Sequence, residues 1–149
     1  MMLKDIDKLI LQKLQDCRRG TLQMISDDVG KQTSRVAHRL MILRKIGVIT
    51  ANGGVYEINN GVDISKIEDM QLTKEQIIEL LEDKHWNALK VLGEEPLTRY
   101  NEIRERNEWT RWQATSIMDE LVVFGVINRV QRGVYELTEI GKAVLDEQA

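Results

Sequence analysis

Polar and basic side chains that could contact nucleic acid gather between residues 31 and 45. Arginine can pair with guanine through two hydrogen bonds and glutamine with adenine, while serine and histidine can reach bases or phosphates. Lysine and further arginines suit phosphate contacts, which position a protein on a duplex without reading its sequence. The candidates toward bases are Gln32, Ser34, Arg35, His38 and Arg39, and those toward phosphates are Lys31, Arg44 and Lys45. The alternative is an ordinary solvated basic face.

A second group of such side chains follows about 80 residues later. Its candidate DNA contacts are Arg111, Gln113, Thr115, Arg129 and Arg132. Trp109 and Trp112 are three residues apart, which places them on one face of a helix. Exposed tryptophans suit a protein interface better than a major groove, so we predict a protein contact there. The alternative is that one or both cap the local core. Asp119 and Glu120 lie farther along and would repel phosphates if they face DNA.

Residues that carry other chemistry are scarce. Cys17 is the single cysteine, which excludes an internal disulfide framework and a zinc site of several cysteines. His38 and His85 have no second ligand at metal-binding spacing. No phosphate-binding glycine loop or nucleophile motif occurs. We therefore expect no enzyme, no metal site and no cofactor.

Charge is distributed unevenly over the 149 residues, whose formal net charge is −3. Residues 1–60 hold ten basic and six acidic side chains, a net charge of +4, which leaves −7 for the remainder. A sign change of this kind indicates a division of labour between segments. The start becomes charged at once, and no run of about 18 apolar residues occurs. These features predict a cytoplasmic protein with no membrane segment.

An internal repeat organises the chain. The segment 46–50 recurs as 124–128, an offset of 78, and the segment 54–58 recurs as 133–137, an offset of 79. The change of one residue falls where a hairpin turn is expected to absorb it. Apolar positions coincide over roughly 50 residues. We infer that the chain contains two copies of one small unit.

Each copy reads as three helices followed by a hairpin. In the first copy, apolar spacing predicts helices before Arg18, over 21–29 and from Thr33 or Ser34 to Gly47, with a hairpin turn at Asn52-Gly53. In the second, residues 73–93 form one helix or two, and helices follow over 99–106 and 110–124. A hairpin around Arg132-Gly133 and a last helix over 138–147 complete it. The predicted division is a first domain over 1–58, a linker over 59–72 and a second domain over 73–149.

This order resembles the winged helix-turn-helix family. Residues 21–40 resemble a helix-turn-helix core, and residues 43–49 and 121–127 resemble the passage from recognition helix into wing. Residues 133–145 resemble the last wing strand and following helix of MarR-like and archaeal-type winged-helix regulators. The resemblance implies a mainly α fold with small β-hairpin wings, as two tandem winged helix-turn-helix domains.

The resemblance also implies a function. In this family the recognition helix lies in the major groove, so residues 32–45 would dock on double-stranded DNA in a transcriptional regulator. The first wing carries no basic residue at its tip, which departs from that pattern. The acidic second domain would then either dock on DNA less tightly or mediate assembly with a protein partner or a second copy. The alternative is a winged-helix scaffold that binds proteins in a chromosome or transcription complex.

Overall fold

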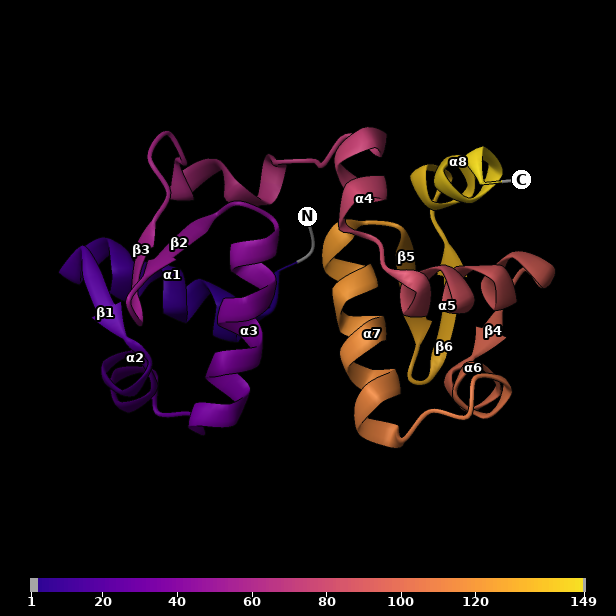
Figure 1. Ribbon diagram of the computed structural model, residues 1–149, viewed down its shortest axis with the longest axis horizontal. Helices are drawn as coiled ribbons and strands as arrows, with labels where there is room; N and C mark the ends of the chain where they lie inside the picture. The colour runs from indigo at the N-terminus through magenta and orange to yellow at the C-terminus, as the bar shows by residue number, and fades with distance from the viewer. Residues whose placement is uncertain (1–2, 149) are drawn as a thin grey trace. The chain divides into compact units, whose positions relative to one another are not determined.

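The computed structural model describes residues 3–148 and divides into two compact units (Figure 1). The first unit comprises Leu3–Met70, and the second begins at Gln71. Each unit contains one three-stranded antiparallel sheet among its helices. The tandem arrangement that the repeat predicts is therefore confirmed.

The first unit has the element order of a winged helix. Its elements are α1 (Asp5–Cys17), β1 (Arg19–Thr21), α2 (Leu22–Val29), α3 (Thr33–Lys45), β2 (Ile49–Asn52) and β3 (Val55–Ile58). The strand β3 lies in the centre of the sheet, with β1 and β2 at its edges. The helices pack on one another because each turns one apolar stripe inward, for example Val36, Leu40 and Leu43 of α3, all fully buried.

The second unit repeats this order and adds a helix at each end. The repeated elements are α5 (Asp83–Glu94), β4 (Thr98–Arg99), α6 (Tyr100–Arg106), α7 (Arg111–Phe124), β5 (Ile127–Gln131) and β6 (Val134–Leu137). The additions are α4 (Lys74–Leu80) and α8 (Glu139–Glu147). The stretch 73–93 therefore forms two helices, separated at Leu81 and Glu82. The fold is mainly helical with small hairpin wings, as the sequence predicts.

Threonine side chains cap several of the helices. The hydroxyl groups of Thr21, Thr110 and Thr138 each accept a hydrogen bond from a backbone N–H in the first turn of α2, α7 and α8. These contacts satisfy donors that would otherwise lack partners. Gly30, at the end of α2, has a φ of 72°, a left-handed conformation that glycine adopts without steric cost.

The turn of the first wing differs from the prediction by one residue. Asn52 pairs with Val55 in the β2–β3 ladder, so the two turn residues are Gly53 and Gly54. Their φ values are 60° and 80°. A two-residue hairpin of this type needs positive φ at both central positions, and two glycines adopt it without a steric clash.

The segment 59–72, which we expected to be a linker, belongs largely to the first unit. Residues up to Met70 lie in this unit and include the 3-10 helix η1 (Ile64–Asp69). Its Ile67 is buried, and the amino group of Lys8 in α1 lies 2.5 Å from a carboxylate oxygen of Glu68. An apolar side chain and an ion pair thus tie the segment to the domain. With this boundary, the first unit holds eleven basic and nine acidic residues, a net charge of +2, and the second holds ten and fifteen, a net charge of −5.

We predict that Glu68 titrates below its ordinary range. The hydrogen bond and the charge of Lys8 lower the pKa of this carboxyl below 4.5. The ion pair therefore contributes to stability above that value, and the contribution is lost as the pH falls through the lowered pKa. Carboxyl NMR titration should show the low value, and the Lys8→Met variant should raise it. An unchanged pKa in that variant would show that the pair does not form in solution.

Each unit buries one charged or polar pair between its first and third repeated helices. In the first unit, the guanidinium of Arg39 in α3 donates to both carboxylate oxygens of Asp7 in α1, at 2.7 and 2.6 Å. In the second, His85 Nε2 of α5 lies 2.6 Å from a carboxylate oxygen of Glu120 in α7. Asp7 and His85 occupy equivalent positions, 78 residues apart, yet one is acidic and the other basic. Each copy therefore joins its first and third repeated helices by such a pair. The acid lies on the first of these helices in one copy and on the third in the other.

The backbone determines which nitrogen of His85 carries the proton. The N–H of Glu82 donates to His85 Nδ1 at 2.9 Å, so that nitrogen must be unprotonated. Nε2 then bears the hydrogen and donates it to Glu120. Asp7 plays the same capping role in the first unit, where it accepts from the N–H of Lys4 at 2.8 Å. Each of these side chains therefore both caps its own helix and joins it to another.

Candidate nucleic-acid interface

The start of α3 presents polar and basic side chains to solvent. Gln32 is the residue before the helix, and Ser34 and Arg35 lie in its first turn. All three are exposed, as is Lys31 before them. They face outward because the stripe through Val36 faces the core. The structure thus brings together four of the predicted contacts at the end of the helix that enters the major groove in a helix-turn-helix protein.

Arg39 is not a DNA contact, which corrects the prediction. Its side chain is only 3% exposed and its guanidinium is paired with the carboxylate of Asp7, whose side chain has no exposed area. Arg39 follows Arg35 by four residues, so the two side chains lie close together on the helix surface. The spacing of apolar residues therefore cannot show which arginine is exposed and which is buried. The residue that separates them is Asp7, 32 positions away in the chain.

The remaining candidates of this helix differ in exposure. Arg44, in the last turn, is exposed, whereas His38 and Lys45 are half-buried. Within residues 3–148, no ion pair joins Lys31, Arg35 or Arg44 to a carboxylate. These three cations therefore keep their charge available to an anionic ligand.

The first wing offers little to a phosphate backbone. Its turn consists of Gly53 and Gly54, and Asn52 precedes them, so its tip carries no charge. The nearest arginine in the sheet, Arg19 of β1, lies 3.5 Å from a carboxylate oxygen of Glu57. The sequence-based expectation of a weak wing contact agrees with this arrangement.

In the second unit, Tyr100 connects the start of α7 to the tip of the wing. Its hydroxyl donates to the backbone carbonyl of Arg111 at 2.7 Å and lies 2.9 Å from the hydroxyl of Thr115. Its backbone N–H donates to the carbonyl of Gly133 at 2.7 Å. Predicted contacts far apart in sequence, Arg111 and Arg132, thus belong to neighbouring segments. Sequence reasoning missed Tyr100, because an aromatic residue at a helix start usually reads as core.

A second tyrosine extends this cluster along the wing. The pKa of Tyr135 in β6 is raised chiefly by burial, while the positive charge of Arg129 opposes the shift and Asp119 and Tyr100 add to it. Arg129 is also the register partner of Tyr135 in the β5–β6 ladder. Arg129 and Arg132 are both exposed. The aromatic pair therefore lies between the wing arginines and the first turn of α7.

The two tryptophans do not share a helical face, which corrects the prediction. Helix α7 begins at Arg111 after the cap Thr110, so Trp109 lies outside it, in the preceding loop. Trp109 is half-buried, whereas the side chain of Trp112 in the first turn is 73% exposed. Glu120, one of the two acids expected to repel phosphates, is fully buried against His85. Asp119 is half-buried.

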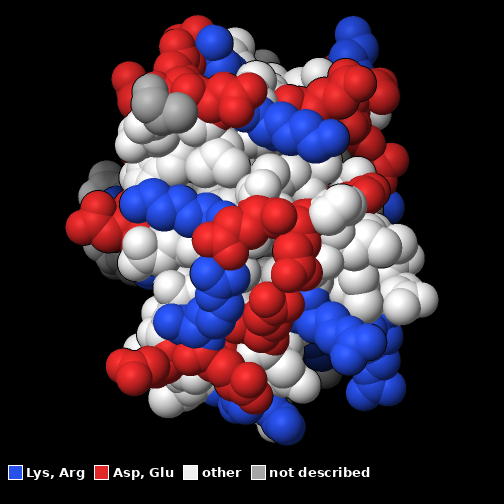
Figure 2. All heavy atoms as spheres, turned by 90° about the vertical axis from the view of Figure 1, so that its right-hand side faces the viewer, with Lys and Arg blue, Asp and Glu red and all other residues white. Residues whose placement is uncertain are grey.

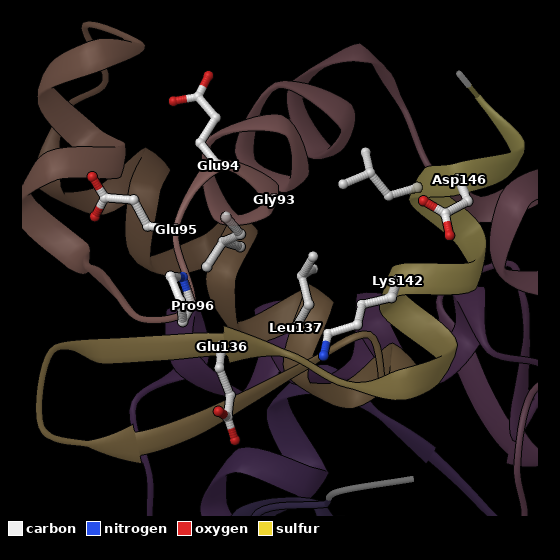
Figure 3. Close-up of a pocket in the computed structure, with 10 residues that line it drawn as sticks. Gly93, Glu94, Glu95, Pro96, Glu136, Leu137, Lys142 and Asp146 are labelled. Atoms are coloured by element: carbon white, nitrogen blue, oxygen red, sulfur yellow. The ribbon is translucent and has the colours of Figure 1, made fainter.

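Several acidic side chains of the second unit line a cavity. Figure 2 shows acidic and basic side chains interspersed over the face that lies at the right of Figure 1. A cavity of about 510 Å³ is lined by Glu94, Glu95, Glu136, Asp146 and Lys142. Figure 3 shows Glu94, Glu95 and Glu136 pointing away from one another, which does not suit a cation site. Among the described residues, no three His, Cys, Asp or Glu side chains could hold a metal ion.

The net charge of the second unit does not describe the charge of its wing. The unit's net charge is −5, yet the wing strands and their turn, residues 127–137, contain two arginines and one acid, Glu136, and Arg111 lies at the start of α7. Glu94 is held by Arg106, whose guanidinium donates to both its oxygens at 2.6 and 3.1 Å, and this contact lowers the pKa of Glu94. The negative net charge thus says little about the side that carries the wing.

Comparison with known proteins adds a structural likeness. No protein-family model matches the chain, and no curated protein matches it. The mRNA-binding domain of elongation factor SelB from E. coli, solved in complex with SECIS RNA, is similar over 92% of this chain and 100% of that chain. Identity is 17% and the TM-score is 0.34. At this score the winged-helix assignment rests on the order of helices and strands described above. Within residues 3–148, no helix has the length and apolar character needed to cross a membrane.

Proposed function

We propose that the chain binds nucleic acid and that the start of α3 enters the major groove of duplex DNA, as in a winged-helix regulator of transcription. The observation that carries this proposal is the exposed group Lys31, Gln32, Ser34 and Arg35 at that end of the helix. In helix-turn-helix proteins, side chains at this end reach base edges. Arg35 is the strongest candidate for base contact because its guanidinium can donate two hydrogen bonds to guanine.

Phosphate contacts would come from few side chains. Lys31 precedes the helix, Arg44 lies in its last turn, and the wing tip is uncharged. About two neutralised phosphates would give a slope of about −2 in a plot of log affinity against log salt. Binding should therefore be moderate and clearly dependent on salt. A second copy or a second binding unit would steepen the slope.

The test is an anisotropy titration of the full chain with labelled duplex DNA at two salt concentrations. We expect Arg35→Ala to weaken binding by about 1–3 kcal/mol, which is roughly 5- to 150-fold. Arg132→Ala, in the other unit, is the matched control and should weaken duplex binding less. Circular dichroism should show that both variants are folded, because both side chains are exposed.

Two results would overturn the proposal. Absence of duplex binding at about 50 mM salt would exclude phosphate-mediated recognition, because the electrostatic contribution of phosphate contacts to affinity is largest at low salt. The opposite order of the two variants would show that the second unit holds the duplex. Duplex RNA of the same sequence serves as a further arm, since its deep and narrow major groove does not admit an α-helix.

A further inference from the structure

The first turns of α3 and α7 are equivalent in the repeat, but they present different chemistry. Both helices begin 78 residues apart, at Thr33 and Arg111, so Trp112 takes the position that Ser34 holds in the first unit. Ser34 is a small hydroxyl that fits a groove. The indole of Trp112 is large, is 73% exposed and offers a single N–H donor. The two units therefore cannot read the same form of nucleic acid in the same way.

We propose that the second unit binds unpaired nucleotides of a single strand or loop, with a base stacked on Trp112. The surface concerned, which we call the aromatic–arginine face, consists of Tyr100, Arg111, Trp112, Arg129 and Arg132. It goes beyond the duplex contact assigned to α3, because it lies on the other unit and takes another class of ligand. Stacking of a base on an aromatic side chain contributes about 1–3 kcal/mol and depends little on sequence.

The geometry of this face suits a strand with splayed bases. Tyr100 joins the wing tip to the first turn of α7 through its bonds to Gly133 and Arg111, at 2.7 Å each. Arg111 and Arg132 consequently lie on the two segments that Tyr100 connects, and Trp112 follows Arg111 directly. Phosphates of a flexible backbone can reach separate arginines while a base between them stacks.

Charge complementarity favours a nucleic acid over a protein on this face. Its three arginines are exposed although the unit as a whole has a net charge of −5. Of the two acids in α7, Glu120 is buried against His85 and Asp119 is half-buried. A polyanion would therefore meet exposed cations at this face.

The experiment uses the full chain and three labelled oligonucleotides: a short DNA single strand, its RNA counterpart and the matching DNA duplex. We expect Trp112→Ala to weaken binding of both single strands by about 10- to 100-fold. Trp112→Phe should keep most of the affinity, and Trp112→Leu should behave like alanine, because leucine preserves apolar area without a π face. Val130→Ala, an exposed apolar residue of the same wing, is the matched control and should have little effect.

A second readout is the emission of the tryptophans themselves. A base stacked on Trp112 should quench its fluorescence, and the quenching should disappear in Trp112→Phe while Trp86 and Trp109 still report. The RNA and DNA arms separate the two sources of an unpaired base. The duplex separates this proposal from the previous one. Arg35→Ala should weaken duplex binding, but its affinity for single strands should stay within about twofold of the wild-type value, a change smaller than the stacking contribution.

Three outcomes would overturn the proposal. The first is wild-type affinity of Trp112→Ala and Trp112→Leu for single strands. The second is absence of single-strand binding at about 50 mM salt, whether or not the duplex binds. The third is a change of sedimentation behaviour in Trp112→Ala without any change in oligonucleotide binding, which would assign the face to a contact between protein chains.

Discussion

Replacing Arg39 by alanine is expected to lower the free energy of unfolding of the first unit by about 3–5 kcal/mol. The substitution removes both donors at 2.7 and 2.6 Å from Asp7 and leaves a carboxylate with no exposed area. A small domain is stable by only about 5–15 kcal/mol in total. The loss should therefore unfold a large fraction of this unit under mild denaturation.

Urea unfolding can assign that loss to one unit. All three tryptophans, Trp86, Trp109 and Trp112, lie in the second unit, so their fluorescence reports that unit while circular dichroism reports both. Arg39→Ala should shift the circular dichroism transition more than the fluorescence transition.

Two further variants test the cause of this loss. Arg35→Ala, exposed on the same helix, should change stability by less than about 0.5 kcal/mol. Replacing both partners, with Asp7→Leu and Arg39→Met, should restore much of the stability because no buried charge remains. If Arg39→Ala were as stable as Arg35→Ala, the buried pair of Arg39 and Asp7 would not stabilise the first unit.

A methyl group at Gly141 is expected to destabilise the second unit by about 3 kcal/mol. A Cβ built there would overlap the carbonyl oxygen of Val126, which is backbone and cannot rotate away. That oxygen also accepts the N–H of Thr138 at 3.0 Å, and Thr138 caps the helix that contains Gly141. Relief of the overlap would therefore pull the start of α8 away from the unit.

The expected loss of stability on Gly141→Ala is opposite in sign to the effect of helix propensity. An exposed glycine inside a helix usually gains about 1 kcal/mol when it becomes alanine. Ala143→Gly, at an exposed position of α8, is the matched control and should cost about that amount. The measurement is urea unfolding followed by tryptophan fluorescence. Stabilisation by Gly141→Ala would contradict the close approach of α8 to Val126.

Local patterns in the sequence predicted most helices and both wings. Apolar residues at helical spacing, threonine caps such as Thr21 and Thr138, and glycines at turns act over a few residues, so they can be recognised without the fold. The repeat offset of 78 then extended each assignment from one copy to the other. The sequence pattern did not predict the strands β1 and β4, because they are only three and two residues long. They exist through pairing with β3 and β6, about 35 residues away.

Contacts between distant residues account for the errors at the site. Arg35 and Arg39 have the same chemistry and similar positions on α3, and only the packing of α1 places Asp7 against the second one. Trp109 and Trp112 have helical spacing, but Thr110 begins the helix between them. The extent of the first unit depended likewise on the burial of Ile67 and the pair Lys8–Glu68.

The sequence by itself determined that the chain is a tandem of two small winged-helix units, because periodicity, caps and turns are properties of neighbouring residues. It also determined which segments are rich in nucleic-acid-binding side chains. Only the tertiary structure decided which of these side chains reach solvent. Burial of a charge requires a partner, and that partner comes from another helix, as Asp7 does for Arg39 and His85 does for Glu120. For the same reason, Tyr100 acquires its place between wing and helix only when the unit is folded.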